Sequence, residues 1–458
     1  MKHRLRPALS GLLLALAVFA AHAADPKPAP RETLLLRPER VWTGDDDASL
    51  TGWAVLVRDG AIVAVGPADT IEAPADARRI DLPGATLTPG LIDLHSHLFL
   101  HPYNEAPWND QVLKEAEAYR TLLAARHARD TLRAGFTSLR DLGTEGAGYA
   151  DLSLKRAIDE GLIPGPRLFV ATLAIVATAS YGPGPRGFRP DLELPGGAQE
   201  VSGVDETVRA VREQAGHGAD WIKVYADYRI GADGSAQPTF SAAELRALVE
   251  TAHLSGRTVA AHAATDAGMR MAIEAGVDSI EHGYGGSAAT FRLMREKNVA
   301  YLPTLTAVES TEQYYNGYVP GQSPPTPKLR EAEQAFRTAL AQKTTIGCGS
   351  DVGVFRHGDN YREPAWMVRL GMSPAQALRA CTSVAARILR QSERIGRIAP
   401  GLRADLAAFA GDPSQRIDAL RQPLLVLKDG VVYRSPEEPQ APGQDGPEPA
   451  AATAQPVR

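Results

Sequence analysis

The sequence predicts an α/β protein in which a (β/α)8 barrel is joined to a small β-sandwich domain built from both ends of the chain. The first observation is that eight short apolar segments alternate with helical patterns between residues 89 and 396, as expected for a parallel barrel. The second is that strand and hairpin patterns occur before and after this region. The third is that polar residues able to bind metals follow several of the apolar segments. A doubly wound open sheet is the alternative that this alternation leaves open.

Length, charge and cysteine content narrow the class of protein. A chain of 458 residues can bury one large core and a smaller one. The net charge of −5 and the scattered Lys and Arg residues argue against a nucleic-acid partner. Only Cys348 and Cys381 are present, so at most one disulfide can form and a thiol-based metal site is excluded. Any metal must therefore be held by nitrogen and oxygen ligands.

The first residues have the pattern of a secretory signal peptide. In residues 1–23 a basic start precedes an apolar run and a small-residue cleavage site ending at Ala23. The apolar run is too short to span a bilayer, so we expect cleavage, export to the periplasm or outside the cell, and no stable membrane anchor. An uncleaved anchor is the alternative. Residues 24–32 are expected to be a tether, and the Pro- and Glu-containing residues 436–458 a disordered tail.

Residues 33–88 and 397–435 have β-type patterns and are expected to form the sandwich domain together. In the first range two apolar runs are joined by Asp59-Gly60, which is a strong hairpin signal. The same arrangement returns near the other end around Asp429-Gly430. The barrel domain, residues 89–396, would then be inserted between the two halves of the sandwich.

Helix signals separate the strand candidates of the barrel. Ser241 and Glu244 form a capping box that opens one helix. Ser373 and Pro374 are typical of a helix start, and the pattern continues to about Arg390. The eight strand candidates are residues 91–97, 136–142, 167–173, 221–226, 258–263, 279–283, 300–305 and 344–351.

Two insertions interrupt the short connections. Residues 174–204 follow the third strand candidate, and residues 306–327 follow the seventh. Long loops on the C-terminal face of a barrel are usually lids or specificity loops. Contacts between subunits are the alternative.

Polar residues recur at the C-terminal ends of the strand candidates, where barrel enzymes place their catalytic groups. His95 and His97 are two positions apart, so on a strand their side chains point to the same side. Each residue alone has an ordinary structural explanation, such as a hydrogen-bonded core histidine or a snorkelling lysine. Their joint occurrence predicts one shared site. Its members are His95 and His97 at strand one, Lys223 at strand four, His262 at strand five, His282 at strand six and Asp351 at strand eight.

Nitrogen and oxygen ligands without cysteine suit Zn²⁺, or else manganese, iron or cobalt. A protonated lysine is not a ligand, but a lysine that is desolvated beside cations loses its proton readily. Its free amine can take up CO₂ and become a carbamate, a bidentate anion able to bridge two metals. Lys223 is the candidate for this modification.

The chain resembles the amidohydrolase superfamily, in the branch that contains imidazolonepropionase-like enzymes and binuclear-metal dipeptidases. The matching motifs cover about residues 33–435 in the order expected for that superfamily. They are residues 89–97, Ile222-Lys223-Val224, Ala261-His262-Ala263, Ile280-Glu281-His282-Gly283, Gly349-Ser350-Asp351 and residues 396–406.

The resemblance implies a distorted (β/α)8 TIM barrel with a β-sandwich and two divalent metals, most often zinc, bridged by a hydroxide. Asp351 and His282 are the predicted catalytic residues. Asp351 would take the proton of the attacking hydroxide as general base and pass it to the leaving nitrogen as general acid. By analogy His95, His97, Asp351 and carbamylated Lys223 hold one metal, and His262, His282 and the same Lys223 hold the other.

Substrate-binding residues are predicted in two places. The segment from Phe355 to Asn360 resembles the His-Gly-Asp-Asn segment of peptidase-like members, with a loop-stabilising turn as the alternative. Arg229 is suited to grip a substrate α-carboxylate, with a surface salt bridge as the alternative. The chain differs from many relatives after Lys223 and at Ala264, so the specificity of any one relative does not transfer. The full set of candidates is Tyr228, Arg229, His357, Asp359 and Asn360.

We therefore expect an exported binuclear metal-dependent hydrolase of dipeptides or N-acyl amino acids, in the manner of an Xaa-Pro dipeptidase or carboxypeptidase. It would act on a small-molecule or dipeptide substrate and assemble as a homo-oligomer. One alternative is hydrolysis of cyclic amides, lactones or xenobiotic amides at the same metals. The alternative from another class is a non-catalytic periplasmic protein that binds a ligand through metal.

Overall fold

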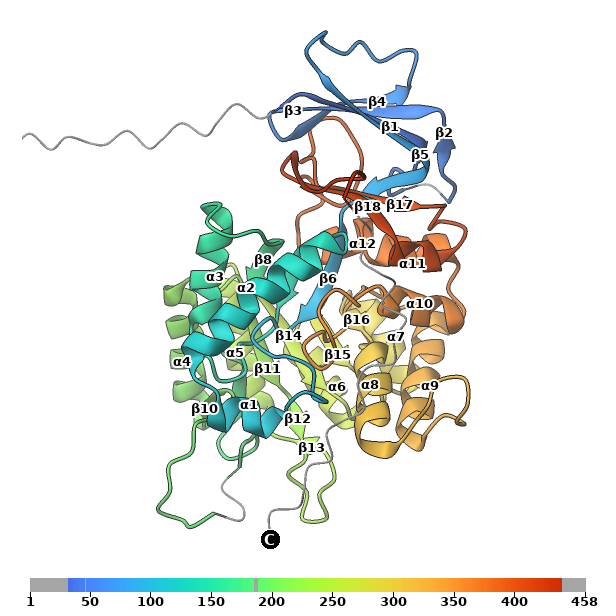
Figure 1. Cartoon of the computed structure of the whole chain (residues 1–458). Coiled ribbons are helices and arrows are strands. Elements are labelled where there is room, and N and C mark those ends of the chain that lie inside the picture. The colour runs from blue at the N-terminus through green and yellow to red at the C-terminus, as the bar shows by residue number, and fades with distance from the viewer. Residues whose placement is uncertain (1–31, 46, 185–187, 439–458) are drawn as a thin grey trace, which may run out of the picture.

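The computed structural model describes residues 32–45, 47–184 and 188–438. The predicted signal peptide, all but the last residue of the predicted tether, and residues 439–458 of the predicted tail lie outside these ranges. Figure 1 shows a sheet built from strands of both chain ends beside a larger α/β body. Within the described ranges no helix has both the length and the apolar character needed to cross a membrane.

The strands from the two chain ends form one eight-stranded sheet, in the order β19-β18-β17-β5-β1-β3-β4 with β2 beside β1. Both predicted hairpin turns, Asp59-Gly60 and Asp429-Gly430, are confirmed, with positive φ at all four residues as such two-residue turns require. The strands are β1 (Leu34–Val41), β2 (Leu50–Thr51), β3 (Trp53–Arg58), β4 (Ala61–Pro67), β5 (Arg78–Pro89), β17 (Leu406–Ala410), β18 (Pro423–Lys428) and β19 (Val431–Arg434).

This sheet differs from a sandwich of two separate sheets. Antiparallel pairing of β5 with β17, from Ala85 opposite Ala410 to Pro89 opposite Leu406, joins the N-terminal and C-terminal strands into one ladder. The buried core beside it draws residues from both chain ends, among them Leu36 and Leu427. Because this apolar core needs both segments, neither end of the chain could bury its strands alone.

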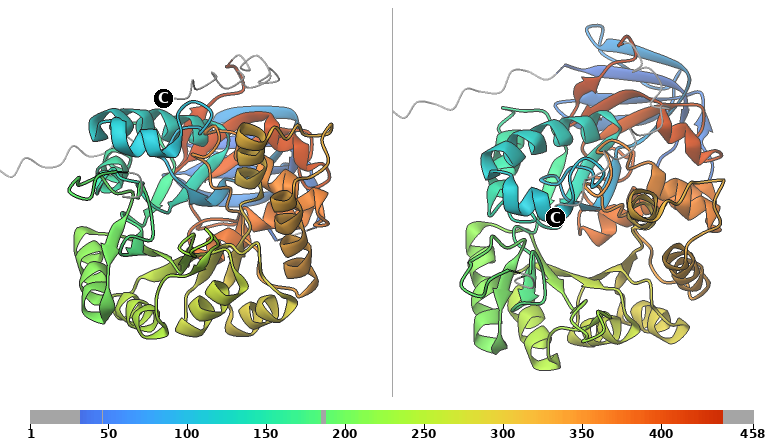
Figure 2. Two further views of the ribbon diagram at one scale, coloured as in Figure 1. Left: turned by 90° about the horizontal axis from the view of Figure 1, so that it is seen from below. Right: turned by 60° about the horizontal axis from the view of Figure 1, so that its bottom comes forward.

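The middle of the chain alternates parallel strands with helices, and the predicted fold class is confirmed. Figure 2 shows the helices as an outer layer around the strands. Parallel pairing runs through β6-β7-β8 and through β9-β11-β14-β15-β16, with β10 at the edge beside β9. The strands are β6 (Leu91–Ser96), β7 (Phe136–Asp141), β8 (Arg167–Val170), β9 (Ile175–Ala177), β10 (Gln199–Val201), β11 (Trp221–Tyr225), β14 (Thr258–Ala263), β15 (Ser279–His282) and β16 (Ala300–Leu302).

The predicted eighth strand is irregular. Residues 344–351 contain no regular strand. The segment joins its neighbours through isolated bridges, at Ile346 with Tyr301 and, one residue beyond the range, at Val352 with Ser96. Its chain carries two glycines, Gly347 and Gly349, and ends at Asp351 with φ +62°. A left-handed residue cannot continue a strand, so this segment fills the eighth position without a full ladder.

The two helices whose starts were predicted begin at their capping residues, but one of them ends early. The Ser241 capping box and the Ser373 cap are both present. The helix expected to run from Ser373 to about Arg390 is divided at Thr382, whose ψ is −97°. The carbonyl of Cys381 accepts a hydrogen bond from Ile92 N on β6, so a tertiary contact takes the place of the next helical bond.

The two insertions contain regular structure. Residues 174–204 include β9 and β10, and the first half of residues 306–327 belongs to helix α8. The small strands β12 (Asp227–Tyr228) and β13 (Gln237–Pro238) make a separate hairpin after β11. The helices are α1 (Trp108–Lys114), α2 (Glu117–Arg133), α3 (Ala150–Asp159), α4 (Gly203–His217), α5 (Ala242–Leu254), α6 (Asp266–Ala275), α7 (Ala288–Lys297), α8 (Leu305–Asn316), α9 (Pro327–Ala341), α10 (Arg362–Arg369), α11 (Pro374–Ala380), α12 (Ser383–Ile388) and the 3-10 helix η1 (Ile417–Arg421).

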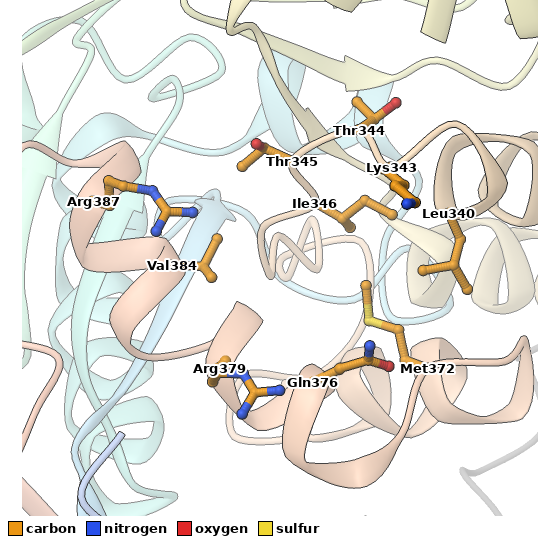
Figure 3. Close-up of a pocket in the computed structure, with 10 residues that line it drawn as sticks. All are labelled: Leu340, Lys343, Thr344, Thr345, Ile346, Met372, Gln376, Arg379, Val384 and Arg387. Carbon is orange, nitrogen blue, oxygen red and sulfur yellow. The ribbon is translucent and has the colours of Figure 1, made fainter. Parts of the chain in front are cut away.

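A cavity of about 590 Å³ lies at the start of the eighth barrel segment, away from the ends of the strands. Thr344 and Ile346 line it, whereas Asp351 stands at the other end of the same segment. Figure 3 shows that its walls come from α9, α11, α12 and the chain between them. None of the predicted site residues lines this cavity.

Candidate metal centre

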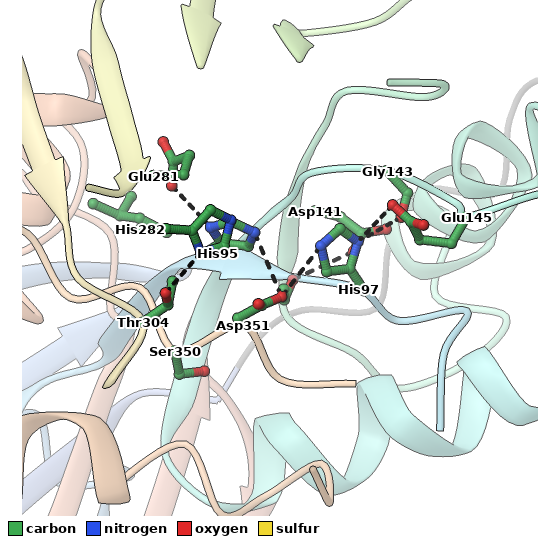
Figure 4. A network of polar contacts seen from close by, with 12 residues as sticks. His95, His97, Asp141, Gly143, Glu145, Glu281, His282, Thr304, Ser350 and Asp351 are labelled. Atoms are coloured by element: carbon green, nitrogen blue, oxygen red, sulfur yellow. Dashed lines mark hydrogen bonds and ion pairs between the residues drawn. The ribbon is translucent and has the colours of Figure 1, made fainter. Parts of the chain in front are cut away.

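His95 and His97 meet Asp351 at the end of β6. The Nε2 atoms of the two histidines lie 3.5 and 3.4 Å from Asp351 Oδ1 (Figure 4). One donor atom from each of the three residues falls within 4.8 Å of the others, a spacing that a single metal ion can span. The backbone of Asp351 is held there because its N–H donates to the carbonyl of His95. His95, His97 and Asp351 therefore lie together, as expected for members of one shared site.

His282 and His262 lie on the neighbouring strands beside this group. The ring centroid of His282 is 5.1 Å from that of His95 and 4.5 Å from that of His262. Parallel pairing of β14 with β15 places His262 opposite Glu281, and Ala263 opposite His282. The four histidine rings thus form a continuous row along the C-terminal ends of the strands.

Lys223 points into the interior from β11. The whole residue is buried, and its Nζ has no hydrogen-bond partner among the described residues. Burial lowers the pKa of Lys223 to about 8, because a charged amine loses its hydration in the interior. A buried polar group without a hydrogen-bond partner is rare in folded proteins. Uptake of CO₂ or contact with a bound ligand would give the Lys223 amine a partner.

Burial also governs the charge of the histidines. It holds the pKa of His95, His262 and His282 well below the usual value, and the neighbouring cationic groups add to the effect. These rings are therefore neutral near pH 7, which is the form that binds metals. Burial raises the pKa of Asp351, so this carboxylate accepts a proton more readily than an exposed aspartate.

The outer nitrogens of three of the histidines are already engaged. Nδ1 of His95 lies 2.9 Å from Glu281 Oε2, and Nδ1 of His97 lies 2.9 Å from the carbonyl oxygen of Gly143. Nδ1 of His282 lies 2.8 Å from Thr304 Oγ1. These contacts leave the Nε2 atoms of His95 and His97 to face the centre. Such outer partners fix the orientation of ligand rings in metal sites.

Two charged residues in the barrel strands were not predicted as part of the site. Glu281 contacts His95, and Arg140 donates from Nη2 to Glu281 Oε1 at 2.8 Å. Both side chains are completely buried. The signal that singled out Lys223, a charged residue inside an apolar segment, applies equally to Arg140 in residues 136–142 and Glu281 in residues 279–283.

A cluster of aromatic side chains surrounds Glu145 beside the centre. Glu145 Oε2 accepts from Trp108 Nε1 at 3.0 Å and from the Tyr181 hydroxyl at 2.7 Å. Tyr225 stacks on His262 with a centroid distance of 4.5 Å and packs against Tyr181. The predicted site residue Tyr228 also contacts Tyr181 and His262. The insertion after the third strand therefore reaches the metal centre through Tyr181.

The predicted residues of the 355–360 segment have other partners. His357 Nε2 contacts the Leu100 carbonyl and its ring stacks on His127, while Asp359 pairs with Arg356. These are the contacts expected of the loop-stabilising alternative rather than of residues facing a substrate.

Asn360 contacts the candidate metal centre indirectly, through Asp93. Its Nδ2 donates to Asp93 Oδ2 at 2.7 Å, and Asp93 accepts from His95 N and Ser350 N. Asn360 thus braces the two backbone segments that carry the ligands. Arg229 is exposed directly after β12 and follows Tyr228.

The strand ends bring together four histidines, an aspartate and a buried lysine, which is a donor set that suits divalent metals in hydrolases. Among known sequences, the Amidohydrolase family matches residues 86–433. The chain belongs to this family and is a hydrolase acting on carbon–nitrogen bonds.

Individual relatives and solved structures agree with this family assignment. The chain is 29% identical to ochratoxinase of Aspergillus niger over 420 residues, which cover 85% of each chain. It is 25% identical to imidazolonepropionase of Geobacillus kaustophilus over 387 residues, which cover 78% of this chain and 83% of the relative. A crystal structure of an Xaa-Pro dipeptidase with methionine bound in the active site superimposes with a TM-score of 0.79 at 30% identity, over 88% of this chain and all of that one.

Proposed function

We propose that the protein is an exported binuclear hydrolase of dipeptides or N-acyl amino acids, similar to an Xaa-Pro dipeptidase or carboxypeptidase. The observation that carries this proposal is the convergence of His95, His97 and Asp351 beside the unpartnered amine of Lys223. The structural similarity to an Xaa-Pro dipeptidase and to a prolidase complexed with N-methylphosphonate-L-proline supports the substrate class.

The residues present fit two divalent metals. One group of donors is His95, His97 and Asp351, and the neighbouring pair is His262 and His282. Lys223 stands on the strand next to that of His262, so a carbamate on its amine would serve both groups. An all-nitrogen and oxygen donor set favours Zn²⁺ in such a site. When bound, the metals would polarise the substrate carbonyl and lower the pKa of water.

Asp351 is suited to hold the proton during the reaction. Its side chain is 14% exposed, more than the completely buried Lys223, and its pKa is raised by burial. It can therefore receive a proton at the carboxylate and release it to the leaving nitrogen, because a raised pKa makes this carboxylate a stronger base than an exposed aspartate. Nδ1 of His282 contacts Thr304 Oγ1, so Nε2 is the nitrogen of this ring that would bind a metal.

The aromatic cluster and Arg229 define how a substrate would lie. Tyr225 and Tyr181 present ring surfaces beside His262, and such surfaces exclude water from the reacting amide. Arg229 at the end of β12 provides a cation that binds a free α-carboxylate through two hydrogen bonds. The substrate would thus be anchored at the carboxylate and cleaved at the amide over the metals.

Metal analysis combined with a dipeptide and N-acyl amino acid panel tests the proposal. Two equivalents of metal per chain and hydrolysis of substrates with a free α-carboxylate support it. Turnover restricted to cyclic amides, lactones or xenobiotic amides would support the alternative that the similarity to imidazolonepropionase and ochratoxinase raises. Bound metal without turnover of any amide or ester would support a non-catalytic binding protein.

We also propose export after cleavage near Ala23 and assembly as a homo-oligomer. The signal-peptide pattern of residues 1–23 supports export. N-terminal sequencing of the mature protein from a periplasmic fraction tests the first proposal, and light scattering of the mature protein tests the second.

A further inference from the structure

A buried chain of polar groups lies beneath His95 and joins three barrel strands. Arg140 on β7 donates from Nη2 to Glu281 Oε1 at 2.8 Å and from Nη1 to Ser279 Oγ at 3.0 Å. The Ser279 hydroxyl in turn donates to Glu281 Oε1 at 2.6 Å. The second carboxylate oxygen, Oε2, is the atom that meets His95 Nδ1 at 2.9 Å. The chain therefore ends on a predicted metal ligand.

This contact determines which nitrogen of His95 carries the proton. A carboxylate paired with a guanidinium only accepts hydrogen bonds, so His95 Nδ1 must be the donor toward Glu281. The lone pair then resides on Nε2, the atom 3.5 Å from Asp351 Oδ1. Arg140 additionally donates from Nε to the Leu94 carbonyl at 2.6 Å, so the backbone just before His95 is held from the same side.

Stability alone is a weak explanation for this arrangement. Arg140 and Glu281 are both completely buried, and desolvation of a buried ion pair often costs as much as the pairing returns. An apolar pair would fill the space at no greater cost. A carboxylate behind a ligand histidine instead has a known physical use, since it orients the ring and raises the basicity of the nitrogen that faces the metal.

We propose that Arg140 and Glu281 are positioning residues, which fix the orientation and tautomer of His95 and thereby set the affinity of the His95–His97–Asp351 group for a divalent metal. This inference rests on the proposed function in one respect, because it treats that group as a metal centre. It assigns no contact with substrate to either residue.

The test is Zn²⁺ affinity, measured by competition with a chromophoric chelator on the metal-free full-length protein. Glu281→Gln keeps the size of the side chain and removes its charge, and we expect it to weaken Zn²⁺ binding about 10- to 100-fold. Ser279→Ala removes one hydroxyl from the chain and should weaken binding about fivefold. The melting temperature of the metal-free protein is recorded for each variant.

Arg167→Met is the matched control. Arg167 forms a partly buried ion pair with Asp405 and Asp429, at 3.0 and 2.9 Å, in the region where the barrel meets the terminal sheet. Its loss should lower the melting temperature and leave Zn²⁺ affinity unchanged.

The outcomes separate a positioning role from a structural one. Weakened Zn²⁺ binding by Glu281→Gln with a metal-free melting temperature above that of Arg167→Met supports the proposal. Wild-type affinity in Glu281→Gln overturns it, whatever happens to the melting temperature. If Glu281→Gln does not fold, unchanged affinity in Ser279→Ala overturns it and weakened affinity supports it. A wild-type protein that binds no divalent metal overturns both this inference and the proposed function, whereas failure of Glu281→Gln alone leaves the latter standing.

Discussion

The disulfide between Cys348 and Cys381 gives a stability prediction that can be worked from the structure. The two cysteines are 33 residues apart, and both are completely buried. A crosslink of this loop length reduces the entropy of the unfolded chain by an amount worth about 4 kcal/mol. Replacing both cysteines with alanine also leaves a small cavity at each sulfur, at about 1 kcal/mol per site. We therefore expect the double variant Cys348→Ala, Cys381→Ala to lose about 4–6 kcal/mol of the free energy of unfolding.

The measurement is urea unfolding followed by far-ultraviolet circular dichroism, with wild-type protein in a reducing buffer as the control. The reduced wild type should lose the crosslink contribution and resemble the variant. The carbonyls of Cys348 and Cys381 accept hydrogen bonds from Leu94 N and Ile92 N on β6. The disulfide therefore lies beside the strand that carries His95. A loss below about 1 kcal/mol in both proteins would refute the loop-entropy reasoning.

Three further predictions concern single side chains. Lys223→Ala should abolish hydrolysis and lose one or both metals, with partial rescue by short carboxylic acids that replace the carbamate; full activity in this variant would contradict the bridging role. Arg229→Ala should raise KM about 10-fold or more for substrates with a free α-carboxylate, since a charged hydrogen-bonded contact is lost, and an equal effect on amidated substrates would reject this assignment. His127→Phe tests the pH dependence of stability, because burial lowers the pKa of His127 from 6.5 to about 4. Between pH 6.5 and pH 4 the unfolded chain therefore binds a proton at this residue that the folded chain does not bind. The free energy of unfolding of the wild type should fall by up to about 3 kcal/mol as the pH falls through this window. The phenylalanine variant lacks this group, so its stability should depend less on pH over the same range in urea titrations, and an identical slope would show that His127 is not responsible.

The residues of the candidate metal centre could be singled out because each has a local sequence signal. An imidazole at the end of an apolar run is visible at His95, His262 and His282, and a charged side chain inside such a run is visible at Lys223, without any knowledge of the fold. Parallel strands then require that these ends lie at one edge. Asp351 follows a less regular segment, yet its position after Gly349-Ser350 was sufficient to identify it.

The outer partners could not be assigned in the same way. His95 and Glu281 are 186 residues apart, and Asn360 and Asp93 are 267 residues apart. Neither contact is implied by the spacing of residues along one strand or helix. The 355–360 segment shows the consequence, because its polar residues suggested substrate contacts and the structure gives them internal partners instead.

What the sequence by itself determined was the alternation of strands and helices, both hairpin turns, the helix starts at Ser241 and Ser373, and the identity of the histidine, lysine and aspartate groups. These depend on short-range signals such as periodicity, capping residues and Asp-Gly turns. Only the tertiary structure decided that the two chain ends form one sheet through β5 and β17, that the eighth strand is irregular, and that Arg140 and Glu281 stand behind His95. The physical reason is that these features depend on contacts between distant segments, which form only when the apolar cores of the whole chain pack together.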